Sequence, residues 1–155
     1  MRDKIMPAAD DSPPDEKEFV SLFQQIQDMA VSDKIKLASL GNKEARNLLI
    51  KDGNKLIVQA VINSPKISDD EIAQHAGNRN LSKEVARLIS SKKEFLKSYK
   101  IKLALVNNPK TALPVAMKLL LQLREPDLRK ISKSKNVPAL LARTAMRTLS
   151  TRGRA

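Results

Sequence analysis

Residues 57–66 read IVQAVINSPK and residues 101–110 read IKLALVNNPK, so that five of the ten positions are identical at a separation of 44. The stretch KIKLA occurs at residues 34–38 and again at residues 100–104, a separation of 66. Both separations are multiples of 22, which predicts a structural unit of about 22 residues. Weaker copies extend the pattern, and the copies begin near residues 35, 57, 85, 101 and 128.

Each unit is predicted to be a helix, a sharp turn and a second helix. Pro65 and Pro109 end the first helices, because proline cannot continue the hydrogen-bond ladder and moves the preceding residue out of the helical region. Ser68 and Glu71 have the spacing of a capping box, which starts the next helix. Further predicted N-cap residues are Ser32, Ser82, Thr111 and Asn136, and the prolines expected in first turns are Pro114, Pro126 and Pro138. No segment alternates with a period of two for long, so the sequence predicts an all-α protein.

One pair of such short helices exposes an apolar face that only a neighbouring pair can cover. We therefore expect the pairs to stack around a single core as a short α-solenoid of tandem helical hairpins of about 22 residues. The predicted organisation is an acidic, Pro-rich and disordered leader at residues 1–15, a helical repeat domain at residues 16–151 and a basic, frayed tail at residues 152–155. An amphipathic helix from residue 16 to about residue 30 is expected to cap the repeats.

Composition excludes several classes of site. The chain has no cysteine, so it has neither a disulfide framework nor a thiolate metal site. Aromatic residues make up 3% of the chain, too few for the platforms on which single-stranded bases stack. No apolar run is long enough for a membrane span, and the N-terminal residues lack the apolar stretch of a secretory signal. A cytoplasmic location is therefore expected.

The net charge of +12 is distributed unevenly. Residues 1–18 hold three basic and six acidic side chains, which leaves 26 basic and 11 acidic side chains in residues 19–155. A body with a charge of +15 attracts anions at long range, whether nucleic acid, an acidic lipid surface or an acidic protein. The same charge can serve solubility alone, because net charge affects association and not the fold.

The NSPK and NNPK turns, with the I-x-x-A helix before each, resemble leucine-rich variant (LRV) repeats and, more loosely, HEAT-like repeats, over residues 31 to about 151. The tracts KIKLA, GNKEAR and NPKT are also similar to those of an uncharacterised bacterial family of small proteins. These resemblances imply a right-handed superhelix with a binding role, and they imply no catalytic residue. The copies near residues 85 and 128 depart most from the pattern, because proline is absent from their turns or displaced. The iron–sulfur cluster of some LRV proteins cannot apply to a chain without cysteine.

The sequence does not assemble a catalytic site. His75 is the only histidine, and without a cysteine or a second histidine we expect it to be a surface or half-buried helix residue. The carboxylates of the helical part lie beside basic residues or at helix starts, where they complement the helix dipole. The glycines are isolated, so there is no phosphate-binding glycine loop. HEAT-like DNA glycosylases share the general architecture, but a base-excising pocket uses aromatic residues that this chain lacks. We expect no enzymatic activity, no cofactor and no metal.

Basic residues mark the candidate partner-binding surface. A lysine follows nearly every predicted turn, and stacking of the hairpins would place these lysines in a row along one edge. The row consists of Lys43, Lys66, Lys92, Lys93, Lys110 and Lys135, and Arg143 and Arg147 extend the basic surface onto the last helix. The row either binds phosphates or an acidic partner, or it only stabilises helix C-termini in solvent. The arginines likewise either bind an anionic partner or shield the last repeat.

The sequence favours a non-enzymatic adaptor that docks a segment of an acidic protein partner on a basic solenoid surface, as solenoids without site chemistry do. The alternative is sequence-independent binding of duplex nucleic acid through its phosphates, driven by the surplus positive charge. A third hypothesis, docking on an anionic membrane, lacks the hydrophobic anchor that stable attachment needs. A monomer is favoured as the oligomeric state.

Overall fold

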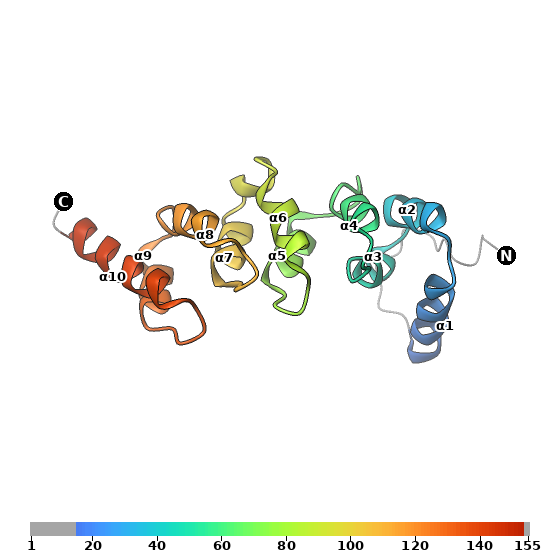
Figure 1. Ribbon diagram of the computed structural model, residues 1–155, viewed down its shortest axis with the longest axis horizontal. Helices are drawn as coiled ribbons and strands as arrows, with labels where there is room; N and C mark the ends of the chain where they lie inside the picture. Colours follow the sequence, from blue (N-terminus) through green and yellow to red (C-terminus); the bar gives the residue numbers. More distant parts are fainter. Residues whose placement is uncertain (1–14, 154–155) are drawn as a thin grey trace. The chain divides into compact units, whose positions relative to one another are not determined.

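The structure is a computed structural model that describes residues 15–153, with the side chain of Phe19 left aside. This part of the chain contains ten α-helices and one short 3₁₀ helix and no strand (Figure 1), so the predicted all-α class is confirmed. The helices group into two compact units, and the boundary falls between Ser68 and Asp69. Each unit has its own buried apolar residues, so we describe each by itself.

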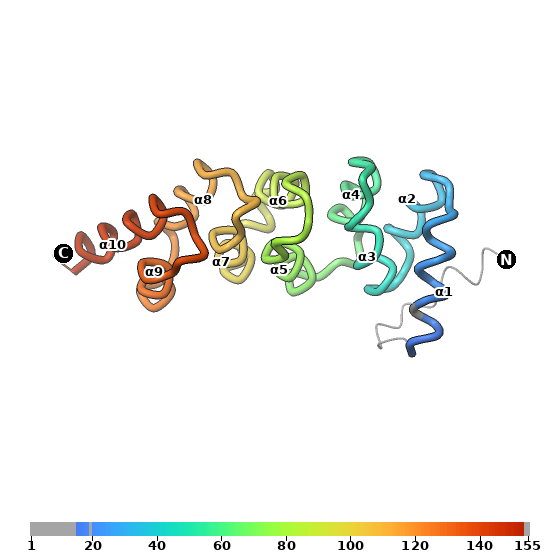
Figure 2. The backbone as a smooth tube through the Cα atoms, turned by 60° about the horizontal axis from the view of Figure 1, so that its bottom comes forward, coloured from blue at the N-terminus to red at the C-terminus, as the bar shows by residue number. Residues whose placement is uncertain are grey.

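The first unit consists of α1 (Glu16–Gln27), α2 (Val31–Leu40), α3 (Lys43–Leu49) and α4 (Lys55–Ile62). Helix α2 packs against both α3 and α4, and α1 packs against α3 (Figure 2). The core of this unit is aliphatic, with Leu37, Leu49, Ile57 and Ile62 almost fully buried. Helix α1 contributes Ile26 to this core, but its Phe23 remains 42% exposed. The helix predicted to cap the repeats therefore keeps an aromatic ring at the surface.

Short polar side chains start three of these helices. Asp15 forms a full capping box with Glu18, in which the Glu18 N–H lies 2.8 Å from the Asp15 carboxylate. Residue 15, predicted to be part of the leader, is therefore the N-cap of α1, whereas residues 1–14 lie outside the described residues. Asn42 and Asn54 cap α3 and α4 with a single bond each, in which their side-chain oxygens accept the N–H groups of Ala45 and Leu56. Helix α2 has Ala30 at its N-cap, so the N-cap predicted at Ser32 is wrong.

Gly41, between α2 and α3, lies so close to Leu37 that a larger residue would force these atoms to shift. A Cβ atom at this position would lie 2.7 Å from the carbonyl oxygen of Leu37 and 2.8 Å from a methyl group of the same residue. The carbonyl oxygen of Gly41 accepts a hydrogen bond of 2.9 Å from the guanidinium of Arg46, which is only 1% exposed. A buried arginine therefore depends on the backbone path that this glycine allows.

The second unit consists of α5 (Asp69–Gly77), α6 (Lys83–Ser90), the 3₁₀ helix η2 (Phe95–Lys97), α7 (Tyr99–Asn107), α8 (Leu113–Leu120), α9 (Glu125–Ser132) and α10 (Ala139–Gly153). Three successive hairpins result, because α5 packs against α6, α7 against α8 and α9 against α10. The hairpins also contact one another, since α5 packs against α7 and α8 against α10. As predicted, Pro114 and Pro126 lie in the first turns of α8 and α9.

Four turns between helices that begin with Ser or Asn share one local geometry although their sequences differ, and Asp52, before α4, accepts the N–H of Asn54 in the same manner. The four turns begin at Ser64, Asn78, Asn108 and Ser134. In each turn the side-chain oxygen of the first residue accepts the backbone N–H two residues later, at 3.4, 3.0, 2.9 and 3.1 Å respectively. In the first three turns, the backbone carbonyl oxygen of the first residue also accepts the N–H of the residue three positions later. Asn and Ser form such bonds readily, so the first residue of the turn, and not a proline, defines its shape.

These turns do not recur at a constant spacing of 22 residues. Successive turns begin 14, 30 and 26 residues apart. The longest interval contains the η2 segment, which lengthens the connection between α6 and α7. The predicted repeat copy near residue 85 therefore differs from the other copies, because the connection that follows its helix contains η2.

Several polar contacts join the hairpins of the second unit, among them those of Tyr99 and Arg152. The Tyr99 hydroxyl donates to the Asp127 carboxylate at 2.6 Å and accepts the backbone N–H of Arg124 at 2.9 Å, which ties the start of α7 to the start of α9. The guanidinium of Arg152 donates to the carbonyl oxygens of Leu121 and Leu123, at 2.6 and 2.7 Å, just beyond the end of α8.

Arg152 lies within α10, so the end of this helix differs from the predicted domain boundary. Helix α10 continues through Gly153, where we predicted a frayed tail from residue 152. Residues 154 and 155 lie outside the described residues.

Candidate binding groove

A groove of about 500 Å³ opens on the second unit. Its walls are α6, the turn between α7 and α8, the first half of α8 and the start of α10, so the second helix of every hairpin contributes. The volume lies within the range of about 300–1,000 Å³ typical of ligand sites. It is large enough for a few side chains of a partner and too small to enclose a folded domain.

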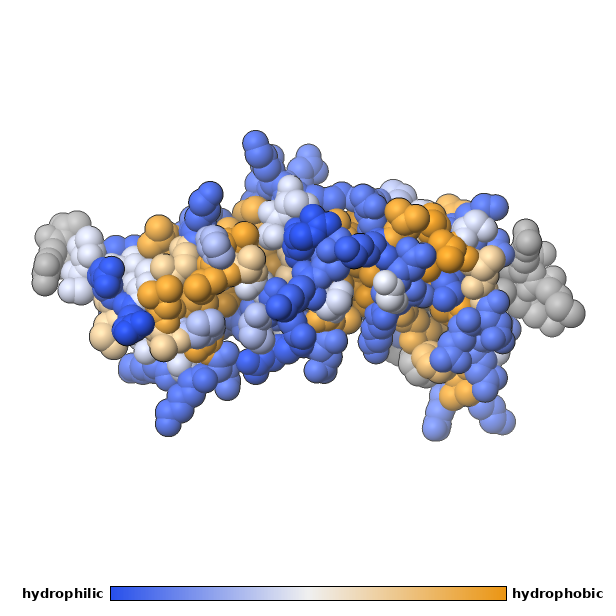
Figure 3. Space-filling view, in the orientation of Figure 1, coloured by the Kyte–Doolittle hydropathy of each residue, from blue (hydrophilic) through white to orange (hydrophobic). Residues whose placement is uncertain are grey.

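Part of the groove lining is apolar. This part includes Leu113, Val115, Ala116, Pro138 and Leu141. Leu113 is 39% exposed although it is a large aliphatic residue, and Leu140 beside the groove is similarly exposed. Figure 3 shows apolar residues gathered on the surface over α8 and α10, with polar residues over α5 and α6 beside them. The groove therefore lies where an apolar and a charged surface meet.

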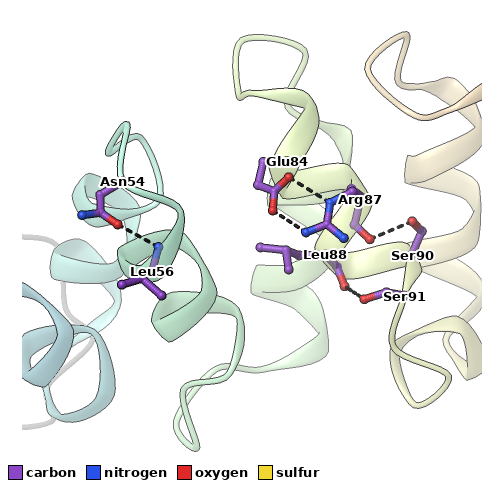
Figure 4. A network of polar contacts seen from close by, with 7 residues as sticks. All are labelled: Asn54, Leu56, Glu84, Arg87, Leu88, Ser90 and Ser91. Carbon is purple, nitrogen blue, oxygen red and sulfur yellow. Dashed lines mark hydrogen bonds and ion pairs between the residues drawn. The ribbon is translucent and has the colours of Figure 1, made fainter.

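The groove lining also contains charged residues. Lys83, Glu84 and Arg87 on α6 and Lys110 on the turn before α8 contribute three cations and one carboxylate to the lining. Glu84 and Arg87 form a two-point ion pair on α6 (Figure 4), and the hydrogen bond and charge of Glu84 raise the pKa of Arg87. Among residues 15–153, the side-chain amines of Lys83 and Lys110 have no acidic partner.

The start of α8 opens into the groove beside Lys110. Its N-cap residue, Ala112, has no side-chain acceptor, and Pro114 has no N–H. The N–H groups of Leu113 and Val115 have no hydrogen-bond acceptor within the described part of the chain. Thr111, which also lines the groove, is 8% exposed, and its hydroxyl has no hydrogen-bond partner in the same part of the chain. The partial positive charge of a helix start thus adds to that of the lysines.

The predicted lysines do not occupy corresponding positions in the turns. Only Lys66 and Lys110 occupy the same place in equivalent turns, the third position, where the other two turns have Asn80 and Asn136. Lys135 occupies the second position of its turn. The predicted correspondence of the lysine positions is therefore wrong, because it followed the letters of the sequence and not the turn geometry.

The remaining predicted residues lie elsewhere. Lys43 is the first residue of α3, and the amine of Lys66 donates to the carbonyl oxygen of Leu40 at 3.1 Å. Lys92 and Lys93 follow α6 in a connection of a different kind, in which the Ser91 hydroxyl donates to the carbonyl oxygen of Leu88 (Figure 4). The amine of Lys92 lies 5.8 Å from the centre of the Phe95 ring.

Arg143 and Arg147 are exposed on α10, outside the groove lining. Of the predicted partner-binding residues, the groove therefore includes Lys110 alone.

His75 differs from our prediction, because it is only 5% exposed. It lies on the buried face of α5 with Ile72 and Ala76, at the spacing of three and four residues that defines one face of a helix. Within residues 15–153, no three histidine, cysteine, aspartate or glutamate residues are grouped as metal ligands would be. No helix in that part of the chain has the length and apolarity needed to cross a membrane.

Sequence reasoning missed Lys83 and Arg87, the two cations on α6. They are four residues apart and therefore lie on the same face of the helix. That spacing was visible in the sequence, but the apolar part of the same groove lining was not, since α8 and α10 follow 23 or more residues later.

No protein-family model, curated protein or solved structure matches this chain.

Proposed function

We propose that this protein is a non-enzymatic binding module and that the groove of the second unit holds a segment of an acidic protein partner. The observation that carries the proposal is the presence, in the lining of one groove, of apolar residues that include Leu113 together with Lys83 and Lys110. Peptide segments offer apolar side chains and carboxylates next to one another, and grooves of this kind bind them.

We further propose that the three hairpins of the second unit are the repeats of a short solenoid of the LRV or HEAT-like kind. The succession α5/α6, α7/α8 and α9/α10 supports this, because each hairpin packs against a neighbouring one. In such an arrangement the second helices line one continuous surface, which is the place of the groove.

The alternative is binding of duplex nucleic acid through phosphates, which the positive charge of the chain favours. The apolar part of the groove lining favours a peptide, because phosphates gain nothing from contact with Leu113 or Leu141. Exposed cations outside the groove, such as Arg143 and Arg147, are those that a duplex would use.

Site-specific photo-crosslinking in cells tests the proposed function. A benzophenone side chain replaces Leu113 in the groove and, as the matched control, Met146, a 60% exposed apolar residue of α10 that does not line the groove. We expect a protein adduct from position 113 that survives nuclease treatment and that position 146 does not give. Equal adducts at both positions, or adducts that disappear with nuclease, would refute the proposal.

A further inference from the structure

We propose that the groove recognises a carboxylate and an apolar side chain that lie next to each other on the partner segment. The carboxylate binds at Lys83 and Lys110, at the start of α8, and the apolar side chain enters between Leu113 and Leu141. This inference rests on the proposed function and adds to it the chemistry of the ligand.

Charge complementarity identifies the carboxylate. The lining carries three cations and one carboxylate, Glu84, whose charge is balanced by Arg87. Two positive charges, those of Lys83 and Lys110, therefore remain without an acidic partner among residues 15–153. The N–H groups of Leu113 and Val115, which have no acceptor among residues 15–153, belong to lining residues of the same groove. An anionic oxygen placed there gains from both sources.

Shape and polarity identify the apolar neighbour. Leu113 is exposed in a wall whose other members are Val115, Ala116, Pro138 and Leu141. A side chain of leucine size that covers this wall removes apolar surface from water on both partners. The wall and the lysines belong to one groove, so a ligand must present both groups within a short segment of chain.

Glu84 limits the affinity of the groove for an acidic ligand. Its carboxylate lies in the same lining and repels an acidic ligand, but the ion pair with Arg87 offsets that repulsion (Figure 4). A ligand carboxylate also competes with Glu84 for Arg87, whose side chain is 64% exposed. Removing the charge of Glu84 should therefore strengthen the binding of an acidic ligand.

The test uses fluorescence anisotropy with the full chain and two labelled peptides of about 12 residues, roughly three turns if helical. One peptide alternates pairs of leucine and glutamate, and the other has glutamine in place of glutamate. We expect the acidic peptide to bind about tenfold more tightly than the neutral one, and the Lys83→Gln/Lys110→Gln variant to lose that difference. Glu84→Gln should tighten acidic peptide binding by about threefold. Leu113→Ser should weaken both peptides by about tenfold.

The matched control is Lys118→Gln, which removes an exposed charge from α8 outside the groove and should leave both affinities within about twofold. If the double variant does not fold, a salt titration of the natural chain replaces it, because only the acidic peptide should lose affinity as salt rises. Equal affinities of the two peptides, or no binding of either at about 1 mM, would overturn this inference.

A third probe, a duplex of about 20 base pairs, separates the two ligand classes. If the duplex binds, and the lysine variant weakens it while Leu113→Ser does not, phosphates are the ligand and the inference is overturned. The crosslinking result is independent of these outcomes. A nuclease-resistant adduct at position 113 together with equal peptide affinities would keep the proposed function and reject only the carboxylate.

Discussion

The side-chain amide nitrogen of Asn108 lies 2.7 Å from the carbonyl oxygen of Ala76, a residue 32 positions earlier in the chain. The amide oxygen of the same side chain accepts the backbone N–H of Lys110 at 2.9 Å. One buried side chain thus holds the turn between α7 and α8 in shape and ties that turn to α5. Because the turn lines the groove, this contact also positions Lys110.

Asn108→Ala should destabilise the protein by about 1–3 kcal/mol, since it leaves the carbonyl oxygen of Ala76 buried without its donor. Urea denaturation followed by circular dichroism measures the change. The matched control is the adjacent Asn107→Ala, which removes only an exposed bond to Leu103 within α7 and should cost less than about 0.5 kcal/mol. Equal costs for the two variants would show that the contact with Ala76 contributes nothing.

Gly41→Ala should destabilise the first unit by about 1–3 kcal/mol, because the new methyl group would meet the Leu37 carbonyl oxygen and force the backbone to shift. Gly53→Ala is the control, since a Cβ atom at that position has nothing within 4 Å. We expect that variant to be neutral or slightly more stable, because alanine restricts the unfolded chain. Thermal unfolding of both variants checks this, and a stable Gly41→Ala protein would contradict it.

Tyr99 should titrate at a higher pH in the folded chain than in the unfolded chain. Burial and the hydrogen bond to Asp127 raise the pKa of Tyr99, because both favour the neutral phenol. Its contribution to stability is therefore complete below about pH 10, the unfolded value, and is lost as pH rises through the higher folded pKa.

Tyrosinate absorbance with and without urea measures the shift, and the signal is unambiguous because Tyr99 is the only tyrosine and the chain has no tryptophan. Identical midpoints in the two states would exclude the shift. Tyr99→Phe should cost about 1 kcal/mol at neutral pH, and less of this difference should remain at strongly alkaline pH.

Arg152→Ala should destabilise the second unit by about 2 kcal/mol, because it removes two charged hydrogen bonds to the carbonyl oxygens that follow α8. Arg147→Ala on the exposed face of the same helix is the control and should be close to neutral. Hydrogen exchange in the last turn of α10 provides the readout. Fast exchange there in the natural chain would indicate that the helix end frays despite the contact.

Local features of this fold could be predicted from the sequence. The helix stops at Pro65 and Pro109 and the first-turn prolines of α8 and α9 follow from backbone chemistry within a few residues. The turn at Asn78 was missed because it shares neither the proline nor the lysine of its equivalents. The Ser91-Lys92-Lys93 segment resembles the turns in sequence and was therefore counted among them. In the structure, however, the Ser91 hydroxyl donates to the carbonyl oxygen of Leu88 at the end of α6 and forms no such turn.

Packing across hairpins could not be predicted from local pattern. The burial of His75 depends on the packing around α5, and the groove depends on α8 and α10 lying near α6. Lysine positions also carried less information than we assumed. The amine of Lys66 donates a hydrogen bond to the carbonyl oxygen of Leu40, whereas Lys110, in an equivalent turn, lines the groove.

In the four turns that begin at Ser64, Asn78, Asn108 and Ser134, the residue that shapes the backbone differs from the residues that vary in charge. The first residue of each sets the backbone path through its own side chain, and the next two positions hold Pro-Lys, Arg-Asn, Pro-Lys and Lys-Asn in the four cases. The turn geometry is thus maintained by one polar residue, while the two residues that follow it differ in charge and size between turns without a change in the backbone path. Substitutions at the second and third positions can therefore alter the charge that these turns present while the side-chain hydrogen bond of the first residue is kept.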